Sequence, residues 1–306
     1  MKIAVVGSYG VGLTMRVPKA PGAGETVSGA RFDEGPGGKG SNQAIAAARL
    51  GADVAFLTAV GDDDFGRSAR ALWEREGVDA SRVSTSAEPT MVGFIIVEPS
   101  GENRIVIAPG ALDTLDAAAV ETFRGEIEAA DVLVVSMEIP MDAVLAALRV
   151  GRESGTTTLL NPAPAQRLPD EAWALIDIVT PNQTEAPILL GLDDDHGMDD
   201  EQLAERLRDT GATVVLTRGG RGALLAGKDG SALRPVEPMV VENVVDTTGA
   251  GDTFTAALAV SLAEGKNLAE AAHYAAAAGA HSVTIAGVIP SLPSRDDIAA
   301  KIGSSR

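Results

Sequence analysis

A stretch in the last third of the chain combines residue types that could bind an anion and take up a proton. From Val245 to Phe254 the sequence is VDTTGAGDTF, and an apolar helical pattern follows. Glycines let the backbone approach a ligand closely, and the unpaired N–H groups at a helix start attract anions. The helix dipole favours an Asp in the first turn in any case. Two interpretations are open: a plain glycine turn before an acidic helix start, or a phosphoryl cradle at 249–251 with Asp252 as a base.

A second glycine-rich segment lies near the start of the chain. Residues 35–43 read GPGGKGSNQ and precede a helical pattern. The spacing does not match a P-loop, because too few residues separate the glycines and Ser41 does not directly follow Lys39. The segment is either a turn ahead of a helix or a second helix start that faces a ligand, with Lys39 and Asn42 as polar contacts.

The glycines after the first predicted strand do not form a dinucleotide fingerprint. Residues 7–12 read GSYGVG, which is not the G-x-G-x-x-G pattern, and no helical pattern follows. A nicotinamide-dependent dehydrogenase is therefore a weak hypothesis.

Composition and charge exclude several classes of protein. The 306 residues carry a formal net charge of −18, so no nucleic acid and no anionic membrane is an expected partner, because both need a basic surface. Without cysteine there is no disulfide, zinc–thiolate site or cysteine nucleophile. The N-terminus reads as a buried strand and not as a signal peptide, and no apolar run is long enough to span a membrane. We therefore expect a cytoplasmic protein.

Apolar strand patterns alternate with helical patterns along most of the chain. Such alternation predicts an α/β fold with a mostly parallel sheet that helices cover on both faces. Four strand patterns outside this alternation predict a small separate sheet: 13–17, 25–30, 91–97 and 104–108. Without a repeat or linker, we expect one domain over 1–306, with lid strands inserted at about 10–35 and 88–110.

Polar segments follow three of the predicted core strands. They are 136–138 (SME), 161–164 (NPAP) and 180–185 (TPNQTE). Ligands of open parallel sheets bind at the carboxyl ends of the strands, so we expect these segments to meet at one ligand site.

Taken together, these segments resemble the ribokinase family of carbohydrate kinases. The resemblance covers essentially the whole chain, and two family signatures stand in the correct order, GGKGSNQA at 37–44 and DTTGAGDTF at 246–254. The segments NPAPA at 161–165, TPNQTEA at 180–186 and PSLP at 290–293 are also similar to the family. The resemblance implies a three-layer α/β sandwich with a mostly parallel central sheet and a small β-sheet lid.

The resemblance also implies an activity and a set of catalytic residues. It implies an ATP-dependent phosphotransferase that acts on an alcohol group of a small sugar, a pentose or a related sugar, with Mg²⁺ and K⁺ as cofactors. Asp252 is implied as the base, and Gly249, Ala250 and Gly251 as the anion hole. Catalysis by preorganised backbone donors fits phosphoryl transfer, which depends mainly on positioning and electrostatics.

Further positions match the family's nucleotide and cation sites. Asn182 and Glu185 match an N-x-x-E motif, in which Glu185 organises Mg²⁺ through water, as expected for an ion that keeps several waters. The implied nucleotide-binding residues are Asn182, Thr217, Gly219 and Gly222. The implied K⁺ loop comprises Asp246, Thr248, Ser282, Ile285, Gly287 and Ser291.

The acceptor end matches the family less completely. The implied acceptor contacts are Gly38, Lys39, Asn42 and Glu138, whereas Gly10 and Gly12 stand where ribokinases carry Asn and Asp. Sites built around a hydroxyl discriminate strongly, so ribose itself is less favoured, and a nucleoside or a sugar phosphate is the alternative acceptor.

Two arginines and the strand edges of the predicted lid raise further expectations. If Arg16 or Arg104 points inward, the acceptor is acidic or already phosphorylated; otherwise both face solvent. Exposed lid strands also imply a homodimer through the lid. A non-catalytic binding protein on the same fold is a further hypothesis, against which the presence of Asp252, Asn182 and Glu185 argues.

Overall fold

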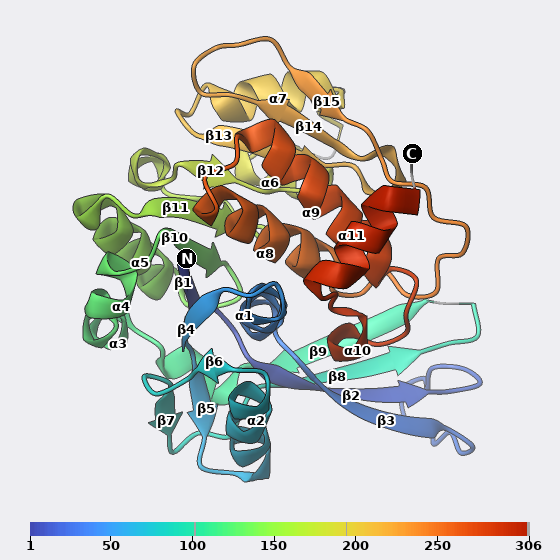
Figure 1. Ribbon diagram of the computed structural model, residues 1–306. Coiled ribbons are helices and arrows are strands. Elements are labelled where there is room, and N and C mark those ends of the chain that lie inside the picture. Colours follow the sequence, from blue (N-terminus) through green and yellow to red (C-terminus); the bar gives the residue numbers. More distant parts are fainter. Residues whose placement is uncertain (101, 194, 305–306) are drawn as a thin grey trace.

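A nine-stranded sheet forms the centre of the molecule (Figure 1). The structure, a computed structural model, describes residues 1–100, 102–193 and 195–304. The strand order is β15-β14-β13-β12-β11-β10-β1-β4-β6. All neighbours pair in parallel except β14, which runs antiparallel to both β13 and β15. The strands are β1 (Lys2–Val6), β4 (Asp53–Leu57), β6 (Val78–Asp79), β10 (Val132–Ser136), β11 (Thr157–Asn161), β12 (Ile178–Val179), β13 (Thr213–Thr217), β14 (Ala223–Ala226) and β15 (Arg234–Val236).

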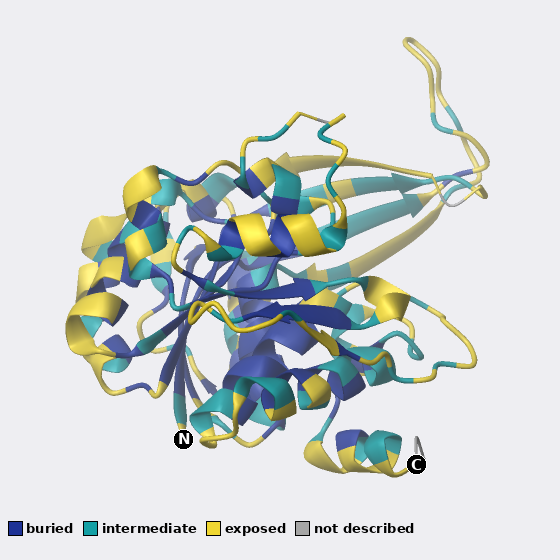
Figure 2. Cartoon of the chain, turned by 90° about the horizontal axis from the view of Figure 1, so that it is seen from above, coloured by how far each residue is buried: buried dark blue, intermediate teal, exposed yellow. Residues whose placement is uncertain are grey.

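Helices cover both faces of this sheet. Alternation along β1 shows why: Ile3 and Val5 belong to one buried apolar cluster, and Ala4 and Val6 to the other. The first face carries α1 (Lys39–Arg49), α2 (Asp64–Arg75), α8 (Ala250–Ala263), α9 (Leu268–Ser282) and α11 (Arg295–Ser304). The second carries α3 (Ala117–Thr122), α4 (Arg124–Glu128), α5 (Met141–Ser154), α6 (Glu185–Leu189) and α7 (Asp200–Arg208). In Figure 2 the core strands and the helical faces packed against them are dark blue, the colour of buried residues. The predicted three-layer α/β fold is confirmed.

A four-stranded sheet projects from one side of the molecule, and we call it the lid sheet (Figure 1). Its order is β3-β2-β8-β9, with β2 (Gly10–Arg16), β3 (Arg31–Gly37), β8 (Val92–Val97) and β9 (Asn103–Ala108). Three of the four predicted strands are present, but the strand predicted at 25–30 is wrong, because the chain there has no regular structure and pairing with β2 begins only at Arg31. In the turn between β8 and β9, residue 101 lies outside the described residues.

Short elements complete the fold. A two-stranded sheet pairs β5 (Ala59–Gly61) with β7 (Ser84–Ser86), and a single turn, α10 (Val288–Ser291), follows α9. In the part of the chain that the structure describes, no helix is both long enough and apolar enough to cross a membrane.

Candidate active site

Asp252 lies in the first turn of α8, directly after a glycine turn. Gly249 caps this helix in the left-handed conformation, with φ of 79°. A Cβ at Gly249 would also lie 2.8 Å from Cγ1 of Val288, so both conformation and space require glycine there. Asp252 is only 7% exposed. The helix start therefore presents backbone N–H groups and a buried carboxylate side by side.

Two side-chain amides from α1 hold both oxygens of the Asp252 carboxylate. Nδ2 of Asn42 donates to Oδ2 at 2.8 Å, and Nε2 of Gln43 donates to Oδ1 at 3.2 Å. Burial raises the pKa of Asp252, although the positive charge of Lys39 and the two amide hydrogen bonds oppose this rise. The result is a carboxylate whose proton affinity exceeds that of an ordinary Asp, as a proton acceptor requires.

Glycines bring the start of α1 against the end of β1. Gly38 has φ of 90°, and a Cβ there would lie 2.5 Å from Cα of Tyr9. A Cβ at Gly40 would lie 2.6 Å from Cα of Gly7. The helix is further fixed by Trp73, whose Nε1 donates to the hydroxyl of Ser41 at 2.9 Å. These contacts are why side chains from the first turns of α1 reach Asp252.

Glu138 lies beside the same helix start. The hydroxyl of Ser8 and the backbone N–H of Lys39 both donate to Oε2 of Glu138, the latter at 3.1 Å. Because β1 and β10 are neighbours, Ser8 and Glu138 both follow the carboxyl ends of adjacent parallel strands. The structure thus brings together Gly38, Lys39, Asn42 and Glu138, all predicted acceptor contacts, around Asp252.

The two glycines that depart from the family differ in their surroundings. A Cβ at Gly10 would lie 2.3 Å from Cε of Met91, so the methionine occupies the space of a side chain at that position. A Cβ at Gly12 would meet only ordinary contacts, at 3.7 Å. Neither position offers a side-chain acceptor, and Met91 makes the region near Gly10 apolar.

The N-x-x-E segment folds into a turn, closed by two reciprocal hydrogen bonds, that leads into α6. Oδ1 of Asn182 accepts from the N–H of Glu185 at 2.9 Å, and Oε2 of Glu185 accepts from the N–H of Asn182 at 2.8 Å. Burial raises the pKa of Glu185, and the charge of Asp252 adds to the rise, against the Asn182 hydrogen bond and the charge of Lys39. The two carboxylates therefore influence each other electrostatically.

The other predicted nucleotide residues lie at the end of β13 and in the turn that follows it, beside this segment. Asn182 forms an isolated parallel bridge with Thr217, and the N–H of Thr217 donates to the carbonyl of Pro181 at 2.9 Å. A single 3₁₀ turn, Gly219–Arg221, follows Thr217, and Gly222 ends it with φ of 77°. A Cβ at Gly222 would lie 2.0 Å from the carbonyl oxygen of Val236, so β15 approaches this turn closely.

Asp246 organises the loop ahead of α8. Its Oδ1 accepts from the N–H of Thr248 at 2.9 Å, and its Oδ2 accepts from the N–H of Gly287 at 3.0 Å. Burial raises the pKa of Asp246, but these hydrogen bonds and the positive charge of Arg16 outweigh it, so the pKa lies below its usual value. Asp246 therefore stays ionised and joins two backbone segments of the predicted cation loop. Of the other predicted members, Ser282 and Ser291 direct their hydroxyls to carbonyls of their own helices, and Ile285 donates its N–H to the carbonyl of Ser282.

The two lid arginines lie on opposite faces of the lid sheet. Gly10, Gly12 and Arg16 share one face of β2 by alternation, and the charge of Arg16 acts on Asp246 of the predicted cation loop. Arg104 lies on the opposite face and pairs with Glu98 at 3.0 Å.

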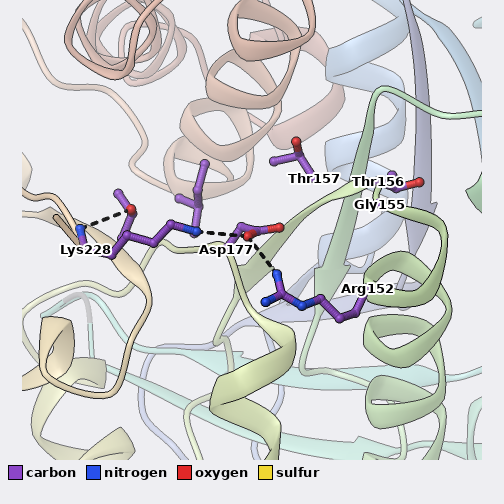
Figure 3. A pocket seen from close by; sticks show the side chains of 8 residues that line it. Arg152, Gly155, Thr156, Thr157, Asp177 and Lys228 are labelled. Atoms are coloured by element: carbon purple, nitrogen blue, oxygen red, sulfur yellow. Dashed lines mark hydrogen bonds and ion pairs between the residues drawn. The ribbon is translucent and has the colours of Figure 1, made fainter.

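A surface hollow lies at the opposite edge of the sheet (Figure 3). It is lined by residues at the amino ends of β11, β12 and β13, including Thr157, Ile178 and Thr213. Within it, Oδ1 of Asp177 pairs with Arg152 at 3.4 Å and with Lys228 at 3.2 Å. These charges satisfy one another, and the hollow shares no residue with the Asp252 region.

Two residues of the site received no role from sequence reasoning. Gln43 touches Asp252 directly, and Met91 fills the space beside Gly10. A polar side chain within an otherwise apolar helix pattern was the available signal for Gln43. No local signal marks Met91, because its contact with Gly10 depends on strand pairing across about 80 residues.

Among the described residues, no cluster of three or more His, Asp or Glu side chains could hold a metal ion by itself.

The fold combines a mostly parallel α/β sheet and a small lid sheet with a glycine turn and a buried carboxylate at the start of α8. The family model for pfkB family carbohydrate kinases matches residues 1–295, and the chain belongs to this family. The ribokinase of Haemophilus influenzae is 39% identical over 301 residues, which cover 96% of each chain. The deoxyribokinase of Salmonella typhimurium is 34% identical over 297 residues, again 96% of each chain. The structure of Arabidopsis thaliana ribokinase, complexed with ribose and ATP, superposes with a TM-score of 0.91 at 30% identity and covers 98% of each chain. The protein is thus a carbohydrate kinase, an enzyme that phosphorylates an alcohol group of a sugar.

Proposed function

We propose that the protein transfers the γ-phosphoryl group of ATP to a hydroxyl of a small sugar, with Asp252 as the base. The hydroxyl oxygen bonds to the γ-phosphorus, the bond from that phosphorus to the β–γ bridging oxygen breaks, and ADP leaves. The hydroxyl proton passes to the Asp252 carboxylate. The observation that carries the proposal is the buried, doubly hydrogen-bonded carboxylate in the first turn of a helix. Backbone N–H groups of Gly249 and Gly251 would stabilise the transferred group, and that of Ala250 would have to exchange its hydrogen bond to the carbonyl of Thr247, at 3.2 Å, to join them.

On the acceptor side, Gly38, Lys39, Asn42 and Glu138 would bind the sugar hydroxyls. Oδ1 of Asn42 is buried without a hydrogen-bond partner, as expected of an acceptor that a substrate hydroxyl completes. Met91 beside Gly10 and the bare backbone at Gly12 remove polar partners from the lid end of this site. We therefore infer a sugar with fewer hydroxyls, or a larger carbon substituent, at that end than ribose has.

The lid arginines favour an uncharged sugar over a sugar phosphate. Arg104 is paired with Glu98 on the lid hairpin, and the charge of Arg16 acts on Asp246. The ion pair of Arg104 leaves it less attraction for an acidic acceptor, and the nearby charge of Asp246 partly offsets that of Arg16.

On the nucleotide side, Asn182, Thr217, Gly219 and Gly222 would bind ATP. Glu185 fits Mg²⁺ held through water, since one carboxylate beside a phosphate site is a typical sparse protein contribution. Mg²⁺ would neutralise charge on the transferred phosphate. The loop of Asp246 and the carbonyl oxygens of Thr248, Ser282, Ile285, Gly287 and Ser291 fits K⁺, because it offers oxygens around an ionised carboxylate.

We further propose that two copies of the chain pair through the lid. One face of the lid sheet exposes Phe32, Phe94 and Val106 at 60%, 43% and 69%. These residues lie on the sheet face opposite Gly12. Two chains that pair through this face would leave the face with Gly10 and Gly12 accessible to the acceptor. Val106→Glu should give a monomer by light scattering, whereas Ile188→Glu, which changes an exposed residue on α6, should not; a wild-type monomer at micromolar concentration would exclude the dimer.

The same proposal treats 1–306 as one functional unit and assigns it to the cytoplasm, where ATP is available. The experiment that tests the function is an ADP-release assay on a panel of pentoses, deoxypentoses, hexoses, nucleosides and sugar phosphates, with and without K⁺. We expect turnover with an unphosphorylated sugar, and stimulation by K⁺. Turnover confined to nucleosides or sugar phosphates would contradict the proposed acceptor.

A further inference from the structure

Gln43 occupies a position that no assigned role explains. It is 1% exposed, and its Nε2 donates both to Oδ1 of Asp252 at 3.2 Å and to Oδ1 of Asn161 at 3.0 Å. An ionised carboxylate only accepts hydrogen bonds, so the amide must turn its NH₂ group toward Asp252. Both N–H donors of Gln43 are thereby used, one on each acceptor.

Asn161 fixes this orientation from the other side. It ends β11, is 6% exposed, and turns its own Nδ2 toward the carbonyl and hydroxyl oxygens of Thr180 at 3.4 and 3.5 Å. The Thr180 hydroxyl lies 3.3 Å from that of Thr255 on α8. Since Asn161 faces a carbonyl with its NH₂ group, its Oδ1 is the atom presented to Gln43. Asp252 and Thr255, the two ends of this hydrogen-bonded network, both lie on α8, so a single helix fixes the distance between them.

We propose that Gln43 and Asn161 are positioning residues for the catalytic base. Gln43 holds one carboxylate oxygen of Asp252 in place and favours its ionised form, and Asn161 holds Gln43 in the orientation that allows this. Asn42 donates to the other oxygen, so each oxygen keeps a free lone-pair direction for the acceptor hydroxyl. The proposal rests on the proposed role of Asp252.

The charges around Asp252 make this assistance necessary. Burial and the charges of Glu138 and Glu185 work against an ionised Asp252, whereas Lys39 and the two amides favour it. Removing one donor from a buried carboxylate favours the protonated form, which cannot accept the hydroxyl proton. The loss should therefore appear in the pH dependence of turnover and not only in stability.

The test compares Gln43→Leu with wild type in the full chain. We expect kcat to fall roughly 10-fold or more at neutral pH, the acidic limb of the kcat profile to move up by about one pH unit, and the KM for ATP to change little. Asn161→Ala should shift the same limb in the same direction, and the double variant should lose little more than Gln43→Leu alone, because one network is broken in each case.

Ser41→Ala is the matched control. Ser41 lies on the same helix, is 0% exposed and accepts a hydrogen bond from Trp73, but it does not contact Asp252. It should lower the thermal midpoint without moving the pH profile. If Gln43→Leu fails to fold, the Asn161→Ala profile decides in its place.

Two outcomes would overturn the proposal. In the first, Gln43→Leu and Asn161→Ala lower only the thermal midpoint, as Ser41→Ala does, and leave the pH profile unchanged. In the second, the losses of the two variants add fully. An active Asp252→Asn variant would instead refute the role of the base itself, so the two failures are distinguishable.

Discussion

Nδ2 of Asn42 lies 2.8 Å from Oδ2 of Asp252, although 210 positions separate the two residues in the chain. This hydrogen bond joins the two glycine-rich segments on which the proposed function rests, one at the start of α1 and one at the start of α8. The two helices pack against each other over the first face of the central sheet. Small residues permit this close packing, since Ala44, Ala47 and Ala257 are all at most 1% exposed. The proposed base and the proposed acceptor contacts at the start of α1 therefore belong to one rigid unit.

The glycine turn before α8 predicts a sharp effect of a single methyl group. Gly249→Ala must adopt a left-handed φ and place its Cβ against Val288. We expect the turn to shift and kcat to fall by about 10²-fold, as when one preorganised donor is lost from an anion hole. Steady-state kinetics with the identified sugar checks this.

Gly155→Ala is the control for strain alone. Gly155 has φ of 75° at the end of α5, and a Cβ there would meet nothing. This variant should lose about 1 kcal/mol of stability and keep full kcat. Equal kcat losses in the two variants would mean that general strain, not the turn, sets the rate.

The raised pKa of Glu185 predicts a pH-dependent gain in stability for Glu185→Gln. A raised folded-state pKa means that folding favours the protonated form, so the contribution of this group is complete below the unfolded value of 4.5 and declines as the pH rises through the folded pKa. At about pH 7 the wild type pays the free-energy cost of burying an ionised carboxylate at position 185, whereas the uncharged glutamine of the variant does not. Its thermal midpoint should exceed that of wild type at neutral pH, and the difference should vanish under acid conditions.

The same Glu185→Gln substitution, which should raise stability, should impair the use of Mg²⁺ in catalysis. Glu185→Gln should need more Mg²⁺ for half-maximal turnover, because the proposed water-mediated contact loses its charge. Glu201→Gln, at an exposed position of α7, is the control for removing a negative charge. A Glu185→Gln variant with normal Mg²⁺ dependence would argue against the metal role, and a lower midpoint at neutral pH would argue against the pKa shift.

Arg49 ties the end of α1 to the segment that contains α10. Its guanidinium bonds both oxygens of Glu76, at 2.8 and 3.1 Å, and the carbonyls of Ile289 and Leu292, each at 2.8 Å. Arg49→Met leaves a partly buried carboxylate and two carbonyls without this partner, so urea unfolding should show a loss of about 2 kcal/mol.

Arg49→Lys should recover only part of that stability, because an ammonium cannot replace the planar fork. Because Ser291 lies between the two bonded carbonyl residues, K⁺ activation should also weaken in Arg49→Met. Arg67→Met, which breaks exposed ion pairs on α2, is the control and should change stability little. Equal losses of stability in Arg49→Met and Arg67→Met would mean that the hydrogen bonds of the Arg49 guanidinium add no more stability than an exposed ion pair does.

The sequence predicted the elements whose pattern is local. The core strands and long helices follow from apolar runs and periodicity, and both lid strands after residue 90 were found from their alternation. The strand predicted at 25–30 was wrong because the charged segment RFDEG, at 31–35, has weak strand preference of its own. Pairing with β2, in which Arg16 faces Arg31 and Gly10 faces Gly37, determines where β3 lies.

Site residues were predictable where glycines and polar residues cluster along the chain. Asp252, Lys39, Asn42 and Glu138 do lie together in the structure. Gln43 was not assigned, because its role depends on which helix packs against α1, and that is a property of the tertiary fold. The comparison of Gly10 with the family revealed an absent side chain but could not show that Met91 fills the space.

The central claim is that Asp252 accepts the proton of the acceptor hydroxyl. Asp252→Asn tests it most directly, with kcat measured on the identified sugar and nucleotide affinity measured by calorimetry. We predict that kcat falls at least 10²- to 10⁴-fold while the nucleotide affinity stays within about twofold of wild type. Turnover within about tenfold of wild type would contradict the account.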